Sequence, residues 1–125
     1  MESMKEIDIH KMLSHPNVIK LYETIDDKED EKVYLIMEYA EKGQILTYDA
    51  TTNQFQPPLS LGVEMLPEKD VRRFSKQIVN AVAYLHGKNI IHCDLKPQNI
   101  LIDGFWNAKV ADFGSAHIYF TEGED

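Results

Sequence analysis

The stretch His92-Cys93-Asp94-Leu95-Lys96-Pro97-Gln98-Asn99 decides the fold of this chain, together with Asp112-Phe113-Gly114, which begins thirteen residues after Asn99. Lys96 lies two residues after Asp94, so in an extended loop the two side chains point the same way. Asn99 and Asp112 offer an amide oxygen and a carboxylate, which suit a hard cation such as magnesium. A carboxylate, an ammonium and two metal ligands are the groups that metal-assisted phosphoryl transfer requires.

The residues between Asn99 and Asp112 predict how these two side chains could meet. Asn99-Ile100-Leu101-Ile102 is typical of a strand, Asp103-Gly104 is a strong turn signal, and Ala108-Lys109-Val110-Ala111 is typical of a returning strand. A hairpin of this kind folds its two ends back together. We therefore expect Asn99 and Asp112 to face the same metal ion.

Each of these signals is weak when it stands alone. A lone Asp near a Lys is usually a solvated pair of little energetic weight, and a lone Asn more often turns the backbone than binds a metal. Here the residue types, their order and the apolar strands between them agree with one another. The joint pattern therefore favours a catalytic site over a coincidence.

Two helices and two strands are predicted around this stretch. Residues 66–86 have an amphipathic pattern, with Pro67 suited to the first turn and Gly87 to the C-terminal stop. The face expected to be apolar consists of Val71, Phe74, Ile78, Val82 and Leu85. Residues 4–13 predict the end of a shorter helix, with Ile9, Met12 and Leu13 on one face. Residues 18–22 and 33–40 predict strands, and the charged run at 26–32 predicts an exposed hairpin tip.

On these residues the chain resembles the eukaryotic protein kinase family, and the Lys-Pro-Gln-Asn segment at 96–99 is similar to the serine/threonine type. The resemblance implies ATP and Mg²⁺ as cofactors and a protein substrate. It also implies that Asp94 is the catalytic base, that Lys96 contacts phosphate, and that Asn99 and Asp112 are magnesium ligands. His92 at the head of the loop is expected to have a structural role, braced against the Asp-Phe-Gly region.

The resemblance also implies residues that bind the nucleotide. Glu6 would pair with a lysine that contacts the nucleotide, although an exposed helix carboxylate is the alternative. Met37 would limit the depth behind the adenine, or be ordinary strand core, and in either role it is expected to be buried. The Glu38 carbonyl and the Ala40 amide would contact the adenine edge, and Leu101 would pack under the ring.

The fold class implied is α+β, a partial kinase-like fold. Residues 1–40 would form the rest of a small lobe, from the regulatory helix through antiparallel strands to the hinge. Residues 41–125 would form the start of a mostly helical large lobe through Asp-Phe-Gly. No glycine-rich phosphate loop is present in the sequence, and the lysine expected to pair with Glu6 would precede Met1. The start inside a helix suggests a partial gene model or a truncated product, with uncovered apolar faces and poor stability on its own.

The layout from Met37 onward suggests a subgroup. Residues 37–46, followed by a polar insert at about 47–65, resemble the calcium/calmodulin-dependent protein kinase kinases. That resemblance implies AMP-activated-type kinases as protein substrates. The insert has no clear period, so it predicts a surface loop, with a partner-binding role as the alternative.

Two residues depart from the family pattern. Cys93 stands where most kinases have an arginine that pairs with a phosphate on the activation segment, and cysteine cannot form that ion pair. We expect Cys93 to be a small buried side chain, with a redox or alkylation handle as the alternative. His10 stands where an apolar residue usually packs on the phenylalanine equivalent to Phe113, and histidine could still pack there.

Composition narrows the class of protein. The net charge of −8 argues against binding to nucleic acid or to anionic membranes. No apolar run is long enough to span a membrane. A single cysteine fits a reducing compartment, so a cytoplasmic location is expected. Three functions remain open: part of a serine/threonine kinase, a truncated non-catalytic binding or regulatory protein, and an unstable fragment without a function of its own.

Overall fold

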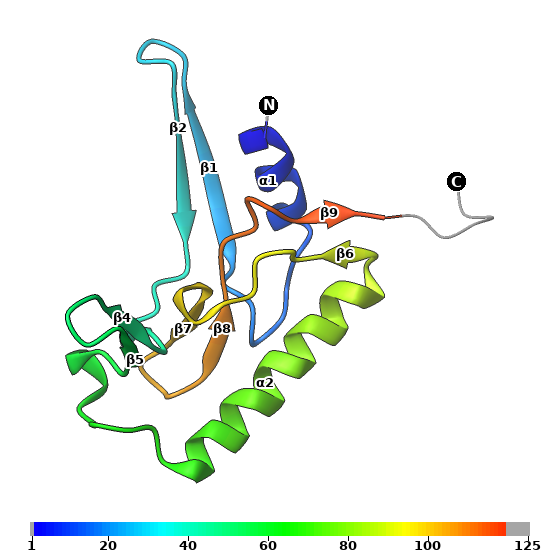
Figure 1. Ribbon diagram of the computed structural model, residues 1–125. Helices are drawn as coiled ribbons and strands as arrows, with labels where there is room; N and C mark the ends of the chain where they lie inside the picture. The colour runs from blue at the N-terminus through cyan, green and yellow to red at the C-terminus, as the bar shows by residue number, and fades with distance from the viewer. Residues whose placement is uncertain (1, 120–125) are drawn as a thin grey trace.

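The computed structural model describes residues 2–119 (Figure 1), which form antiparallel strands and two α-helices. Their order along the chain is α1 (Glu2–Lys11), β1 (Leu21–Asp27), β2 (Lys32–Met37), β3 (Gly43–Gln44), β4 (Thr47–Asp49), β5 (Gln54–Gln56), the 3₁₀ helix η1 (Leu59–Leu61), α2 (Glu68–Gly87), β6 (Ile90–Ile91), the 3₁₀ helix η2 (Pro97–Asn99), β7 (Ile100–Ile102), β8 (Ala108–Val110) and β9 (His117–Ile118). No helix in this part of the chain has the length and apolar character needed to cross a membrane.

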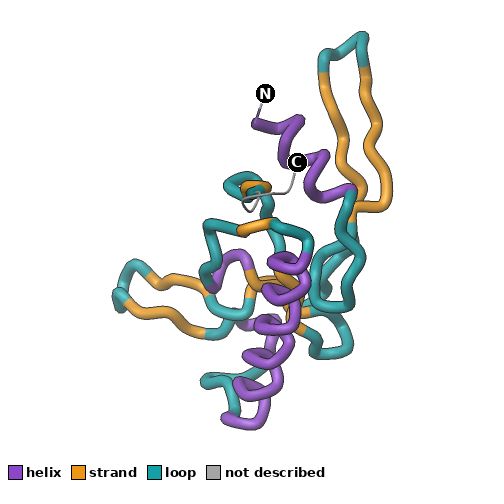
Figure 2. The backbone as a smooth tube through the Cα atoms, turned by 90° about the vertical axis from the view of Figure 1, so that its right-hand side faces the viewer, coloured by secondary structure: helices purple, strands orange, loops and turns teal. Residues whose placement is uncertain are grey.

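The strands form one three-stranded sheet and three pairs. β7 lies between β3 and β8, and both pairings are antiparallel. β1 pairs with β2, β4 with β5, and β6 with β9, each antiparallel. The long β1–β2 hairpin extends away from the rest of the molecule in both views, whereas α2 lies beside β8 (Figures 1 and 2). The β7–β8 hairpin therefore lies in the packed part of the fold.

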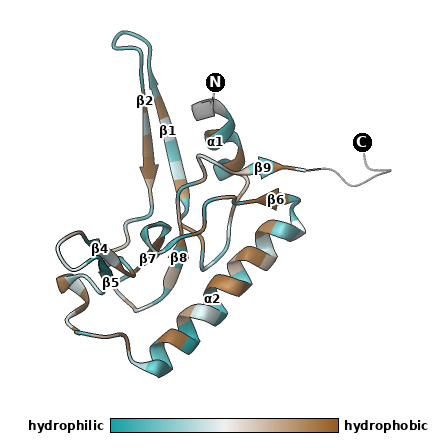
Figure 3. Ribbon diagram, in the orientation of Figure 1, coloured by the Kyte–Doolittle hydropathy of each residue, from teal (hydrophilic) through white to brown (hydrophobic). Residues whose placement is uncertain are grey.

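The core forms where α2 packs against the β7–β8 hairpin. Phe74, Ala81 and Leu85 of α2 are buried, as are Ile102 and Val110 of the hairpin. Figure 3 shows apolar and polar residues alternating along α2, as an amphipathic helix requires. Burial of large apolar side chains at this contact supplies most of the driving force that holds the hairpin in place.

The predicted apolar face of α2 is only partly correct. Phe74 and Leu85 are buried, but Val71 is 43% exposed, because the strands cover only one side of the helix. The helix ends at Gly87 as predicted, but Gly87 does not have a positive φ, and the nearby residue that does is Asn89, with φ 61°. Asparagine tolerates this left-handed conformation better than most residues other than glycine.

In α1 the predicted shared face is wrong at one position. Ile9 and Leu13 are buried, but Met12 is 46% exposed. The helix ends at Lys11, and Met12 and Leu13 form a tighter turn in which their amides donate to the carbonyls of Ile9 and His10. The tighter turn places Met12 off the face that Ile9 and Leu13 share.

The first predicted strand begins later than expected, and the second is shorter. β1 starts at Leu21, because residues 17–19 bond to β8 instead: Val18 forms a parallel bridge with Val110, and the Ile19 amide donates to the Val110 carbonyl at 3.0 Å. β2 ends at Met37, which is 45% exposed, so its predicted burial is wrong. The charged tip of the β1–β2 hairpin is exposed as predicted.

The insert is more ordered than the predicted surface loop. It contains the β4–β5 hairpin and η1, whose Leu61 is buried in the core. Tyr48 and Phe55 pack across the hairpin with ring centroids 5.3 Å apart. The Asp49 carboxylate accepts from the Thr51 amide at 2.9 Å and from its hydroxyl at 2.6 Å. These local bonds define the turn, so a polar sequence forms a hairpin here.

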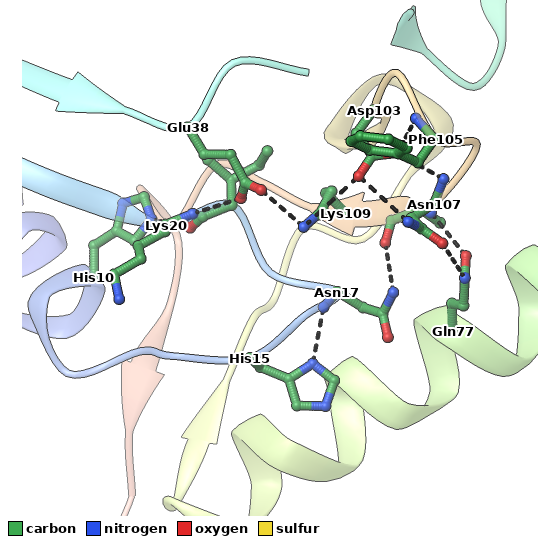
Figure 4. Close-up of polar contacts among 12 residues, drawn as sticks. His10, His15, Asn17, Lys20, Glu38, Gln77, Asp103, Phe105, Asn107 and Lys109 are labelled. Carbon is green, nitrogen blue, oxygen red and sulfur yellow. Dashed lines mark hydrogen bonds and ion pairs between the residues drawn. The ribbon is translucent and has the colours of Figure 1, made fainter. Parts of the chain in front are cut away.

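The connection between α1 and β1 is fastened to β8 through Asn17 (Figure 4). The Asn17 side-chain amide donates to the Ala108 carbonyl at 3.0 Å, and the Asn17 carbonyl accepts from the Val110 amide at 2.8 Å. The Asn17 amide donates to His15 Nδ1 at 3.0 Å. One buried asparagine therefore satisfies polar groups on both segments.

We expect Asn17→Ala to lower the free energy of unfolding by about 1–3 kcal/mol, because it leaves the buried Ala108 carbonyl without a donor. Urea denaturation measures this loss. Asn80→Ala, on the exposed side of α2, is the matched control and should change stability little. Equal effects at the two positions would contradict the role assigned to Asn17.

Protonation of His15 opposes folding. The pKa of His15 lies below its ordinary value of 6.5, first because the ring is desolvated and second because the Lys109 ammonium repels the charged form. Stability from such a group is present above the unfolded pKa and is lost as pH falls toward the folded pKa. The free energy of unfolding should therefore fall more between about pH 7 and about pH 5 in the natural chain than in His15→Gln. Urea denaturation at each pH measures the free energy of unfolding of both proteins. An equal loss in the natural chain and in His15→Gln would contradict the role assigned to His15.

Candidate functional site

The site is organised by the β7–β8 hairpin, whose two ends carry Asn99 and Asp112. The strands pair in the register Ile100 with Val110, and the Ala111 amide donates to the Asn99 carbonyl at 2.9 Å. This pairing brings the backbone of Asn99 and that of the residue preceding Asp112 together, as the sequence predicted.

The turn of this hairpin differs from the predicted Asp-Gly turn. Asp103 Oδ1 accepts from the amides of Phe105 and Asn107 at 2.9 and 2.8 Å, so its side chain closes a longer turn. The residue with left-handed backbone is Trp106, with φ 61°, and Gly104 does not adopt a positive φ. The glycine signal therefore located the turn but not its geometry.

Three of the predicted catalytic residues lie together in the loop before β7. Asn99 Nδ2 donates to the Asp94 carbonyl at 2.9 Å and to Asp94 Oδ2 at 3.2 Å. Lys96 Nζ lies 3.5 Å from Asp94 Oδ2. The side chains of Asp94 and Lys96 are 36% and 49% exposed, so both can reach a ligand, whereas Asn99 is buried.

A cavity of about 270 Å³ holds most of the residues expected to bind a nucleotide. Its lining includes Glu6, Met37, Glu38, Leu101 and Asp112. The residues of the loop cluster, which are Asp94, Lys96 and Asn99, do not line this cavity. The hairpin therefore connects two groups of predicted residues, with Asn99 in the loop cluster and Asp112 at the cavity.

The hinge backbone after β2 leaves the expected groups available. The Glu38 amide donates to the Lys20 carbonyl at 2.8 Å, and the Ala40 carbonyl accepts from the Gly43 amide at 3.1 Å. Within residues 2–119 no hydrogen bond uses the Glu38 carbonyl or the Ala40 amide. An acceptor and a donor two residues apart suit the edge of a flat base.

The side-chain oxygen atoms of Asn99 and Asp112 are of the chemical type that a magnesium ion prefers. Asn99 donates both of its described side-chain bonds from Nδ2, which leaves Oδ1 without a donor among the described residues. Asp112 Oδ1 accepts only from the Gly114 amide, at 3.1 Å, and Oδ2 has no partner in the same region. In the described part of the chain no cluster of three or more His, Cys, Asp and Glu residues is placed to hold a metal. One carboxylate and one amide are the donor set that the sequence predicted.

His92 connects the loop cluster to the end of β8. Its Nδ1 accepts from the Asp94 amide at 3.1 Å, so the proton lies on Nε2, which donates to the Ala111 carbonyl at 2.8 Å. The ring also packs edge-on against Phe113, with centroids 5.2 Å apart. His92 is therefore placed to orient Asp94 and Asp112, in agreement with its expected structural role.

Phe113 lies between two imidazole rings. Its centroid is 5.0 Å from that of His10, which also bonds through Nε2 to the Ile19 carbonyl at 2.6 Å. Phe113 is 1% exposed. Histidine at position 10 therefore packs on the phenylalanine and also satisfies a buried backbone carbonyl.

Cys93 and Glu6 differ from the other site residues in their surroundings. Cys93 is exposed, with φ 70°, so its predicted burial is wrong: His92 takes the inward position, and the next residue faces outward. Glu6 is partly exposed, and none of the ion pairs within residues 2–119 includes it. The predicted pairing of Glu6 with a lysine therefore remains a prediction.

An ion pair between Glu38 and Lys109 was not predicted. Lys109 Nζ lies 2.7 Å from Glu38 Oε1, and Lys109 is 9% exposed although it is charged (Figure 4). A signal was present in the sequence, because a lysine between two apolar residues of a buried strand needs a partner. The sequence does not say which carboxylate that partner is.

We expect Phe113→Ala to destabilise the fold by about 3–5 kcal/mol, because it leaves a cavity between two imidazole rings. Phe105→Ala is the control, since Phe105 is 86% exposed in the β7–β8 turn. Thermal and chemical denaturation measure both. A loss at position 113 no larger than at position 105 would refute the packing described here.

Comparison with known proteins gives one family and several relatives. The family model described as "Protein kinase domain" matches residues 1–124. Together with the antiparallel strands and two α-helices of residues 2–119, this match confirms the predicted fold class, a partial kinase-like α+β fold.

Three relatives illustrate the similarity. The chain is 43% identical over 122 residues to serine/threonine-protein kinase GIN4 of Saccharomyces cerevisiae, covering 96% of this chain and 9% of the relative. It is 39% identical over 111 residues to probable serine/threonine-protein kinase MARK-C of Dictyostelium discoideum, covering 88% and 13%. It is 39% identical over 115 residues to NUAK family SNF1-like kinase 1 of Mus musculus, covering 92% and 16%.

The chain therefore spans between 9% and 16% of the length of these three relatives. All three names describe kinases, and two of them specify serine/threonine kinases. None carries the name of the calcium/calmodulin-dependent protein kinase kinases, so these comparisons do not support that subgroup.

Proposed function

The chain belongs to the protein kinase family, and from that premise we propose that it forms the central part of an enzyme that transfers phosphate from ATP to serine or threonine hydroxyls of a protein. In this proposal residues 1–40 are the rest of the small lobe, and residues 41–125 begin the large lobe. The observation that carries the proposal is the β7–β8 hairpin, which connects the Asp94 cluster to the cavity beside Asp112.

Asp94 would orient the substrate hydroxyl and accept its proton. Its carboxylate is partly exposed, and its position is fixed by Asn99 and by the bond between its own amide and His92. Lys96, 3.5 Å from Asp94 Oδ2, would place its ammonium against the phosphate that is transferred. A cation close to developing phosphate charge is the main electrostatic contribution that a protein can make to this reaction.

Asn99 and Asp112 would hold Mg²⁺, which when bound neutralises charge on the phosphates of ATP. The adenine would lie against Leu101, with its edge on the Glu38 carbonyl and the Ala40 amide. Two features support this placement: Leu101 and Glu38 line the same cavity as Asp112, and the Glu38 carbonyl and the Ala40 amide have no other partner among the described residues. Met37 lines the cavity too and would limit its depth. Glu6, on the same cavity, would pair with a lysine.

The partners and location are proposed on sequence grounds. The layout of residues 37–65 and its resemblance to the calcium/calmodulin-dependent protein kinase kinases would make AMP-activated-type kinases the protein substrates. The single cysteine favours a reducing, cytoplasmic compartment, and the net charge of −8 argues against nucleic acid and membranes as partners.

The natural protein that contains these residues tests the proposal. We expect Asp94→Asn to lower kcat for peptide phosphorylation by about 10²–10⁴-fold, because the amide cannot accept the hydroxyl proton. Phosphate transfer from radiolabelled ATP measures the rate. The control is Asp30→Asn in the exposed β1–β2 turn, which should leave kcat unchanged. A natural protein that binds Mg²⁺–ATP but transfers no phosphate, or an Asp94→Asn variant with full activity, would instead favour a non-catalytic binding role.

A further inference from the structure

The Glu38–Lys109 ion pair joins two parts of the proposed nucleotide site that are 71 residues apart in sequence. Glu38 follows β2 and carries the carbonyl proposed to accept from adenine. Lys109 lies in β8, three residues before Asp112. The two side chains are 21% and 11% exposed, so water screens their attraction less than at an open surface.

Both carboxylate oxygens of Glu38 are engaged. Oε1 is 2.7 Å from Lys109 Nζ, and Oε2 accepts from the Lys20 amide at 3.1 Å. The Glu38 amide also donates to the Lys20 carbonyl at 2.8 Å. Three bonds therefore hold Glu38, and its side chain points toward Lys109 and Lys20 (Figure 4).

Lys109 has a second carboxylate nearby. Asp103 Oδ2, in the β7–β8 turn, lies 4.0 Å from Lys109 Nζ. Asp103 Oδ1 is already held by the amides of Phe105 and Asn107. The ammonium is therefore placed between a carboxylate fixed to its own hairpin and the carboxylate of Glu38.

These bonds form a closed network that links β8, the segment before β1 and Glu38. β8 bonds through Val110 to the backbone of Asn17 and Ile19, the adjacent Lys20 bonds to Glu38, and Glu38 returns to β8 through Lys109. Without the ion pair, Glu38 would be tied to β8 only indirectly, through the segment before β1 and through β3, which begins five residues after Glu38 and pairs with β7. The β1–β2 hairpin would then be freer to move relative to the strand that precedes Asp112.

We propose that the Glu38–Lys109 ion pair is a positioning device that sets the adenine-binding backbone at Glu38 relative to Asp112. This inference rests on the proposed function. Neither side chain touches the reacting atoms, so both are positioning residues. The pair fixes the distance between adenine recognition and phosphate binding, which a single nucleotide must span.

The consequence is a selective loss of nucleotide affinity. Removal of either charge should raise KM for ATP roughly tenfold and leave kcat within about twofold, because Asp94 and Lys96 are unchanged. The inhibition constant of adenosine should rise by the same factor as KM, because adenosine would bind the Glu38 carbonyl and the Ala40 amide through its base. The inhibition constant of tripolyphosphate should be unchanged, because it has no adenine base to bind these backbone groups.

The experiment uses the natural protein that contains this chain, with Lys109→Met, Glu38→Gln and the double variant. Because the two residues act through one interaction, the double variant should be no worse than the weaker-binding single variant. Lys109→Arg keeps the charge and should retain most of the natural affinity. Lys32→Met, an exposed lysine at the start of β2, is the matched control. Thermal melts identify any variant that unfolds, and Glu38→Gln, which keeps the shape of the side chain, provides the test if Lys109→Met does not fold.

Three results would overturn the inference: an unchanged KM for ATP in a folded Glu38→Gln variant, additive losses in the double variant, or equal weakening of adenosine and tripolyphosphate. The last would mean that the pair supports the fold in general. If the natural protein itself binds no Mg²⁺–ATP, the proposed function fails instead, so the two failures can be told apart.

Discussion

Hydrogen bonding on both edges of β8 is the constraint on which the rest of the structure depends. Along one edge β8 pairs with β7, and the ladder continues to the bond between the Ala111 amide and the Asn99 carbonyl. Along the other edge Val110 bonds to Asn17 and Ile19. A strand held on both sides and covered by α2 cannot slide without exposing apolar side chains and unpaired backbone groups. The position of Asp112 is therefore set by β8, because Asp112 directly follows this bonded segment.

The loop before β7 is held by side chains rather than by a ladder. His92 bonds to the Asp94 amide and to the Ala111 carbonyl, and Asn99 bonds to Asp94 through its side chain. Phe113 packs between His92 and His10. Hydrogen bonds and ring packing thus hold Asp94, the proposed base, and Asp112, the proposed metal ligand, in fixed positions relative to β8. That rigidity is what a site for in-line transfer requires.

Local patterns predicted the parts of the fold that depend on local interactions. The apolar run, turn and apolar run between Asn99 and Asp112 formed the expected hairpin, and the amphipathic residues 66–86 formed α2 with its ends shifted by one or two residues. Burial was less predictable, because it depends on which element lies opposite: Met37 and Cys93 are exposed in this chain. The β4–β5 hairpin was missed because side-chain bonds in its turn define it, and they leave no apolar period. The partner of Lys109 was also missed, since it lies far away in sequence.

The most direct test of the account is whether Asn99 and Asp112 share one metal in the presence of nucleotide. Electron paramagnetic resonance can follow the loss of free Mn²⁺ signal as the natural protein that contains these residues is titrated with Mn²⁺ and a non-hydrolysable ATP analogue. We predict nucleotide-dependent Mn²⁺ binding that is strongly weakened in both Asn99→Ala and Asp112→Ala. Mn²⁺ binding that is unchanged in both variants, while the nucleotide still binds, would contradict it.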